Sequence, residues 1–141
     1  MTIIAATLQE MAGDRLIEWD ENPPFYTPKI GRIGNSIYGI CGNPEDAGRF
    51  LEWIGSQRKK ERPNFEEDSF DVLQLNSEGL WLWNKEGVPI RVAENCYAIG
   101  PSAMLAIHHM RTGKSPKRAV ELVLRAEKRA VGPVDVLLLN P

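Results

Sequence analysis

The chain begins Met1-Thr2, and the hydroxyl at position 2 is the first side chain that could take part in a reaction. A threonine hydroxyl is a weak nucleophile near neutral pH and needs a base within hydrogen-bond reach. Removal of Met1 would supply one, because the freed α-amine of Thr2 would have an unperturbed pKa of about 7.7–8.0. Threonine is small enough at position 2 to permit that removal. A structural interpretation is also open, since threonine is β-branched and suits a strand.

Histidines and cysteines, which are common metal ligands, are few and poorly spaced. His108 and His109 are adjacent in a predicted helix, so their side chains point about 100° apart and cannot easily chelate one metal. We interpret them as surface or interface residues. Cys41 and Cys96 form no spaced set, and Cys41 is interpreted as a small buried residue. We therefore predict no metal and no cofactor.

Composition narrows the class of protein. The 141 residues suit one domain, and the proportions of hydrophobic (43%) and charged (26%) residues are those of soluble globular proteins. No apolar run approaches the roughly 20 residues that span a bilayer, and the net charge of -2 gives no attraction to nucleic acid. With no signal peptide evident, we expect a cytoplasmic protein that acts on neither membranes nor nucleic acid.

Two further patterns are interpreted as structural. Trp81 and Trp83 alternate along a predicted strand and therefore share a face. Because no basic groove accompanies them, contact in the core or between subunits is favoured over stacking on bases. Residues 58–62, RKKER, carry both signs of charge and are expected to solvate a loop.

Three segments have the apolar spacing of amphipathic helices. Asn43-Pro44 and Ser115-Pro116 mark two helix starts, because each places a capping side chain before a proline. Gly113 would end the middle helix and let the chain turn into the third. The apolar positions are Ala47, Phe50, Leu51 and Ile54; Ala103, Ala106, Ile107 and Met110; and Ala119, Leu122, Val123 and Ala126.

Short strand-like runs outnumber the helices, and turn residues at 76–79 and 84–87 separate some of them as hairpins. This order predicts an α+β protein with antiparallel sheets and helices packed outside them. The charged segment 57–69 is expected to be a solvated connection. The predicted strands are 2–7, 29–33, 36–41, 70–75, 80–83, 88–92, 96–99 and 134–139.

A series of short stretches resembles the proteasome-type N-terminal-nucleophile hydrolases, in particular the short bacterial and phage proteins related to the peptidase subunit HslV. In chain order they are MTIIA, AGDR, KIGRIGNSIYGICG, AGRFLEWI, FDVLQLNSEGLWLW, GVPIRV, YAIGPSAMLAIHHMRTGKSPKRAVELV and GPVDVLLL. Their order and spacing carry the resemblance. It implies a single domain over residues 1–141, built as a four-layer αββα sandwich of two antiparallel sheets flanked by helices.

The resemblance also implies roles for five residues. Thr2 would be the nucleophile, and the ammonium of Lys29 would disfavour protonation of the α-amine and stabilise the developing alkoxide. Asp14 would hold Lys29 in place, the backbone N–H of Gly42 would stabilise the oxyanion, and Ser102 would provide a supporting hydroxyl. Each residue also has a structural interpretation: a strand end for Lys29, a turn for Asp14, and a strand-to-helix turn for Gly42.

The sequence departs from the family pattern near the end of the predicted site. Where active relatives carry serine after alanine-isoleucine-glycine, this chain has Pro101, followed by Ser102. Where active relatives have an aspartate and then a serine or threonine just before the glycines near the chain end, it has Glu127 and Ala130. The supporting groups are therefore displaced or lost, which is a route to keeping a fold without its reaction.

The resemblance implies a threonine hydrolase that cleaves amide bonds of a peptide or protein substrate through an ester on Thr2. It also implies a homo-oligomeric ring, in a bacterial cell or a phage-infected host, with an unidentified unfoldase as a further partner. The alternative is a non-catalytic scaffold or interaction protein with the same fold, such as a component of a phage particle. Pro101 and Ala130 motivate that alternative.

Overall fold

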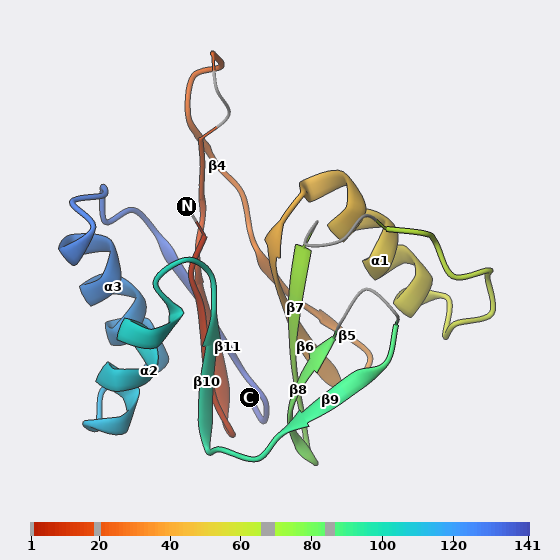
Figure 1. The fold of residues 1–141 in the computed structure, drawn as a ribbon. Coiled ribbons are helices and arrows are strands. Elements are labelled where there is room, and N and C mark those ends of the chain that lie inside the picture. Colours follow the sequence, from red (N-terminus) through yellow and green to blue (C-terminus); the bar gives the residue numbers. More distant parts are fainter. Residues whose placement is uncertain (1, 19–20, 66–69, 84–86) are drawn as a thin grey trace.

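The computed structural model describes residues 2–18, 21–65, 70–83 and 87–141, and within them two large antiparallel sheets lie face to face (Figure 1). The first sheet has the strand order β10-β1-β2-β11. Its strands are β1 (Ile4–Thr7), β2 (Glu10–Asp14), β10 (Cys96–Ile99) and β11 (Val134–Leu138). The chain start and the final strand therefore meet in one sheet, on either side of β2.

The second sheet has the order β5-β6-β7-β8-β9, so each strand pairs with its neighbour in sequence. These strands are β5 (Ile30–Ile33), β6 (Ser36–Gly42), β7 (Phe70–Asn76), β8 (Gly79–Trp83) and β9 (Pro89–Val92). A separate hairpin of β3 (Leu16–Ile17) and β4 (Phe25–Tyr26) follows the first sheet. It projects beyond the rest of the fold in Figure 1.

The helices are α1 (Pro44–Gly55), α2 (Ala103–Arg111) and α3 (Pro116–Ala126). The side chain of Asn43 accepts hydrogen bonds from two backbone N–H groups at the start of α1, and the side chain of Ser115 accepts one from the Arg118 N–H at the start of α3. Gly113 has a φ of +97°, the left-handed conformation that ends α2. Local capping chemistry therefore sets the helix boundaries.

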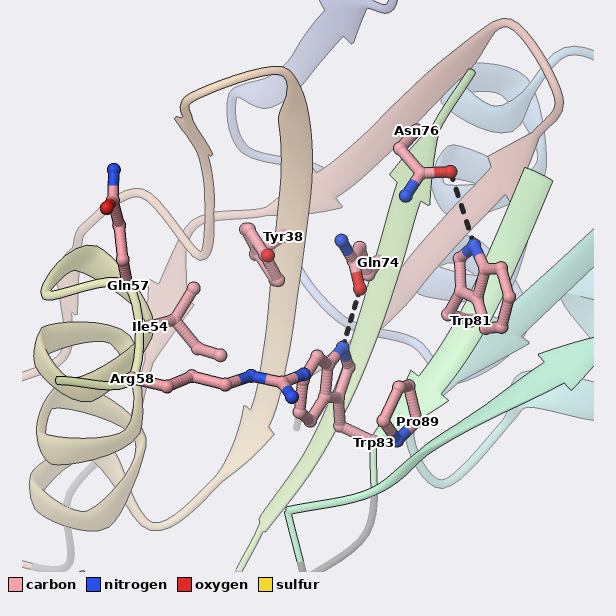
Figure 2. A pocket seen from close by; sticks show the side chains of 9 residues that line it. All are labelled: Tyr38, Ile54, Gln57, Arg58, Gln74, Asn76, Trp81, Trp83 and Pro89. Atoms are coloured by element: carbon pink, nitrogen blue, oxygen red, sulfur yellow. Dashed lines mark hydrogen bonds between the residues drawn. The ribbon is translucent and has the colours of Figure 1, made fainter. Parts of the chain in front are cut away.

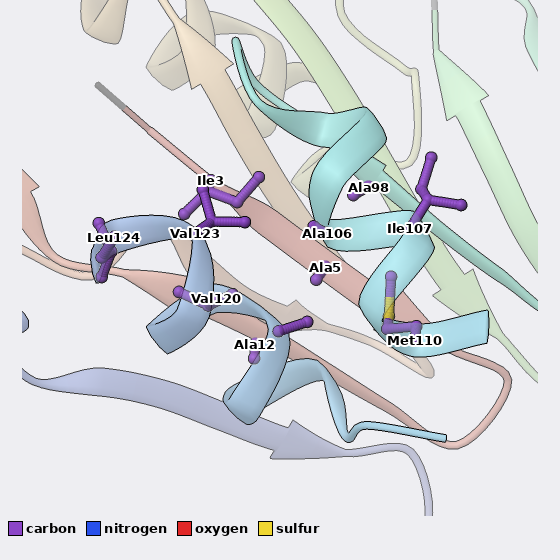
Figure 3. Close-up of a cluster of buried hydrophobic side chains, with 11 residues drawn as sticks. Ile3, Ala5, Ala12, Ala98, Ala106, Ile107, Met110, Val120, Val123 and Leu124 are labelled. Atoms are coloured by element: carbon purple, nitrogen blue, oxygen red, sulfur yellow. The ribbon is translucent and has the colours of Figure 1, made fainter. Parts of the chain in front are cut away.

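Helices α2 and α3 cover one face of the first sheet (Figure 3). Alanines in both sheet and helices let the backbones approach closely, while larger side chains fill the space between them. The opposite face of that sheet packs against the second sheet through Ile4, Met11, Ile37 and Leu73, among others. The buried members of the helix-facing cluster are Ile3, Ala5, Ala12, Ala98, Ala106, Ile107, Met110, Ala119, Val120, Val123 and Leu124.

Helix α1 covers the far side of the second sheet through an aromatic cluster. Phe50 is buried at its centre, with ring centroids 6.0 Å from Trp53, 5.6 Å from Phe70 and 5.3 Å from Trp83. Tilted and edge-to-face contacts at these distances add to the free energy of burial. This cluster fixes α1 against the sheet.

The predicted α+β class, with antiparallel sheets and helices outside them, is confirmed. The segment 57–65 contains neither helix nor strand, as expected, but Phe65 packs on Phe70 with ring centroids 4.8 Å apart. The β3–β4 hairpin was not predicted, because two-residue strands show no periodicity. Residues 66–69 and most of the predicted turn at 84–87 lie outside the described residues.

We expect Phe50→Ala to lower the free energy of unfolding by about 3–5 kcal/mol, because it removes the ring around which the cluster packs. Urea unfolding followed by circular dichroism measures this. Met104→Ala is the control, since Met104 is exposed on α2, and it should change stability by less than about 0.5 kcal/mol. Equal effects of the two variants would contradict the packing described.

Candidate active site

A buried ion pair lies beside the start of β1. The Nζ atom of Lys29 donates a hydrogen bond of 2.8 Å to Oδ2 of Asp14, and another of 2.5 Å to the carbonyl oxygen of Leu16. The two charged side chains are only 5% and 2% exposed, respectively. Burying such a pair carries a large desolvation cost, which close geometry and further hydrogen bonds must offset.

Asp14 supplies the further hydrogen bond and ties the pair to the chain start. Its second oxygen, Oδ1, accepts from the backbone N–H of Ile3 at 2.9 Å, and its own backbone N–H donates to the carbonyl oxygen of Ile3 at 3.3 Å. Ile3 follows Thr2 directly, so one carboxylate holds both the buried cation and the peptide next to Thr2. The predicted nucleophile, cation and acid therefore converge.

Thr2 opens onto a cleft of about 290 Å³. Gly42 lies on its wall, at the end of β6, with a φ of +121° that glycine adopts without strain. The predicted oxyanion donor and the predicted nucleophile thus border the same space. The lining residues are Thr2, Leu16, Ile17, Glu18, Cys41, Gly42, Pro44 and Pro101.

Gly100 is a site residue that sequence reasoning missed. Its φ is +117°, and a Cβ added there would lie 2.1 Å from the carbonyl oxygen of Thr2. Only glycine allows the turn after β10 to pass so close to Thr2. The alanine-isoleucine-glycine stretch was the only hint in the sequence that this glycine matters. Its contact with Thr2 depends on the pairing of β1 with β10, which brings residues distant in the chain together.

Ser102 does not border the Thr2 cleft. Its Oγ donates a 2.7 Å hydrogen bond to Oε1 of Glu127 at an exposed position, while Pro101 lines the cleft in its place. Ala130 lies in the loop before β11, beside Asp14. Of the five predicted site residues, the structure brings together Thr2, Asp14, Lys29 and Gly42.

The Cys41 thiol also faces the cleft but is not poised to react. Burial raises the pKa of this thiol, and the negative charge of Asp71 raises it further, while Lys29 acts in the opposite direction. A raised pKa keeps the group as a thiol, whereas the thiolate is the nucleophile. The cleft therefore offers the Thr2 hydroxyl rather than a cysteine.

Among the residues that the structure describes, no group of three or more histidine, cysteine, aspartate or glutamate side chains is placed to hold a metal ion. None of the helices in these ranges has the length and apolar character needed to cross a bilayer. Met1, whose removal the chemistry requires, lies outside the described residues.

We expect Asp14→Asn to lower the free energy of unfolding by about 3–5 kcal/mol, because it leaves the buried Lys29 ammonium without a counter-charge. Asp135→Asn is the matched control, since Asp135 pairs with Arg15 at a more exposed position and should lose less than about 1 kcal/mol. Chemical denaturation of both variants gives the comparison. Similar losses would show that the Asp14–Lys29 pair is not buried as described.

Gly100→Ala should destabilise the protein more than Gly113→Ala. Both glycines have positive φ, but a Cβ at Gly113 meets nothing within 4 Å. Gly113→Ala should therefore cost only the backbone term, about 1–2 kcal/mol, whereas Gly100→Ala adds about 1–3 kcal/mol for displacing Thr2. Thermal unfolding of the pair measures the difference, and equal costs would refute the close approach.

No family model matches the chain, and no curated protein matches it in sequence. Solved structures do match its fold. Eukaryotic HslV from Trypanosoma brucei has a TM-score of 0.70 at 16% identity, covering 98% of both chains. BPH from Thiobacillus denitrificans in complex with epoxomicin has a TM-score of 0.60 at 19% identity, covering 99% of both. The Anbu complex from Pseudomonas aeruginosa, a helical assembly, has a TM-score of 0.64 at 10% identity, covering 98% of this chain and 80% of that one.

The chain therefore has the fold of HslV and Anbu, and the predicted resemblance to proteasome-type N-terminal-nucleophile hydrolases is confirmed at the level of the fold.

Proposed function

We propose that the protein is a proteasome-like threonine hydrolase, a single four-layer αββα domain in which Thr2 becomes the nucleophile when Met1 is removed. The observation that carries the proposal is the Asp14 carboxylate, which accepts from both Lys29 Nζ and the Ile3 N–H. A buried ammonium is thereby held next to the residue whose amine and hydroxyl would react. The cleft beside Thr2 gives a substrate access to it.

The proposed reaction needs no cofactor. The Thr2 Oγ attacks the carbonyl carbon of an amide, and its proton passes to the α-amine. The Gly42 N–H donates to the oxyanion of the tetrahedral intermediate, whose C–N bond then breaks as the leaving amine takes the proton. Water hydrolyses the resulting ester and restores the hydroxyl. Lys29 favours the neutral amine and the developing alkoxide through its positive charge.

The proposed substrate is a peptide or protein segment. Leu16 and Ile17 give the cleft an apolar wall, and Glu18 carries a carboxylate on the same side. The BPH structure, which shares this fold, is a complex with epoxomicin. We therefore propose that epoxomicin binds at the Thr2 cleft of the mature protein.

We further propose that the protein acts in the cytoplasm as a homo-oligomer. The Anbu neighbour forms a helical assembly, and a similar association of this chain would place several clefts in one particle. An oligomer also restricts which substrates reach the nucleophile. Closed and helical arrangements are both built from one repeated contact.

A non-catalytic scaffold is the second candidate, and three positions favour it. Pro101 occupies the cleft wall, Ser102 is engaged with Glu127, and Ala130 next to Asp14 has no hydroxyl. A protein of this kind would retain Met1 and assemble without turning over peptides. The two candidates differ in the chemical state of the N-terminus.

We expect Thr2→Ala to lower amide hydrolysis by at least about 10³-fold while Thr2→Ser retains activity, because only the hydroxyl is required. Thr7→Ala is the matched control at the end of β1, where the Thr7 hydroxyl accepts a 3.3 Å hydrogen bond from the Gln9 N–H. Turnover of fluorogenic peptides and binding of epoxomicin are the readouts. Intact-mass spectrometry should show that Met1 is absent. A retained Met1, together with turnover that Thr2→Ala leaves unchanged, would overturn the hydrolase proposal.

A further inference from the structure

A second pocket, which shares no lining residue with the Thr2 cleft, lies on the outer face of the second sheet (Figure 2). It has a volume of about 360 Å³. The rings of Tyr38, Trp81, Trp83 and Pro89 line it from strands β6, β8 and β9, and the chain leaving α1 closes one side. Trp81 and Trp83 share this face, as their alternation predicted. Aromatic rings beside proline form surfaces on which proline-rich segments dock.

Two side-chain amides lie between the rings of this pocket. Oε1 of Gln74 accepts from Trp83 Nε1 at 2.7 Å, and Oδ1 of Asn76 accepts from Trp81 Nε1 at 3.2 Å (Figure 2). The Gln74 NH₂ donates to Oγ of Ser36 at 2.8 Å, whereas the Asn76 NH₂ makes no hydrogen bond within the described residues and offers a donor. A carboxylate is the strongest acceptor that a partner could bring to this donor.

Arg58 adds a positive charge to the same pocket. Its guanidinium lies 4.7 Å from the ring centroid of Trp83, and within the described part of the chain no ion pair involves it. Gln57 and Arg58 have φ values of +59° and +62°, a conformation that costs non-glycine residues about 1–3 kcal/mol each. The charged run 58–62 was expected only to solvate a loop, yet its first residue is held over an aromatic ring.

The projecting tip of the β3–β4 hairpin carries the complementary groups. Residues 21–26 read ENPPFY, and all of them are exposed, with Phe25 at 43% and Tyr26 at 52%. Pro23 and Pro24 fix φ near −65° and favour an extended polyproline segment, and Glu21 adds a carboxylate. None of these residues lines the aromatic pocket of its own chain.

We propose that the hairpin tip, residues 21–26, of one copy docks into the aromatic pocket of a second copy. Pro23 and Pro24 would pack on the tryptophan and tyrosine rings, and the Glu21 carboxylate would pair with the Arg58 guanidinium. The inference rests on the homo-oligomer part of the proposed function and not on its chemistry. It names the contact that the assembly uses.

Such a contact is heterologous, because two different surfaces of the chain meet. Each added copy presents one unused tip and one unused pocket, so the contact repeats into a ring or a helix. The base of the same hairpin contributes Leu16, Ile17 and Glu18 to the Thr2 cleft. When the tip docks on the neighbouring copy, the base of the same hairpin would be held in place, and with it one wall of the Thr2 cleft.

Charge reversal tests the contact, with sedimentation velocity of the full chain as the readout. E21R and R58E should each raise the dissociation constant about tenfold or more, because each places like charges opposite one another. The double variant E21R/R58E should regain most of the wild-type association. E94R is the control at an exposed glutamate outside both surfaces, and it should leave the mass distribution unchanged.

Mixing gives the sharpest outcome. An equimolar mixture of E21R and R58E should reassemble with both variants in a 1:1 ratio, since each tip then meets a pocket of opposite charge. Glu21 lies in an exposed turn, so E21R decides the question even where R58E disturbs folding. An oligomeric wild type that E21R leaves unchanged would overturn this contact and spare the homo-oligomer proposal. A monomeric wild type would overturn both the contact and the homo-oligomer proposal. Absence of hydrolysis by Thr2 would overturn the hydrolase proposal alone.

Discussion

The arrangement of the chain start depends on the Asp14 carboxylate, which is almost fully buried and has both oxygens engaged. One oxygen accepts from the Ile3 N–H and the other from Lys29 Nζ. A carboxylate in this setting is tolerated only while both partners are present, because an unpaired buried charge costs several kcal/mol. The pairing of β1 with β2 and the start of β5 must therefore hold their positions together. The interaction couples the two sheets at the point where Thr2 opens onto its cleft.

Small residues between the sheets make that coupling geometrically feasible. A Cβ at Gly13 would lie 2.9 Å from both Ile4 and Ile30, and one at Gly39 would lie 2.5 Å from Ile4. An interior packed this closely has no room for such atoms unless the neighbouring side chains move. Gly13 precedes Asp14, and Ile30 follows Lys29, so the close contact of the sheets brings the two charges within hydrogen-bond distance. Core packing and site geometry are thus one constraint.

Local signals in the sequence were enough for the helices and most strands, because caps and periodicity act over a few residues. Asn43 and Ser115 cap their helices as predicted. The last strand begins at Val134 as expected, whereas the first begins at Ile4, two residues later than predicted. The convergence of Asp14 and Lys29 came from the family resemblance, and their roles remain predictions. Nothing local could indicate that Gly100 abuts the Thr2 carbonyl, or that Arg58 adopts a left-handed conformation over Trp83, because each depends on residues far away in the chain.

The buried Asp14–Lys29 pair also bears on whether the site still has a reaction to perform. Buried ion pairs contribute little net stability, and apolar residues of similar volume often replace them without loss. Packing alone gives no energetic need for this pair, whereas the nucleophile that we propose at Thr2 would use a cation beside it. The changes at Pro101 and Ala130 affect the surroundings of the site, where one hydroxyl has turned to Glu127. The structure therefore holds the buried pair that the proposed nucleophile would use, while Pro101 and Ser102 differ from the family pattern only around it.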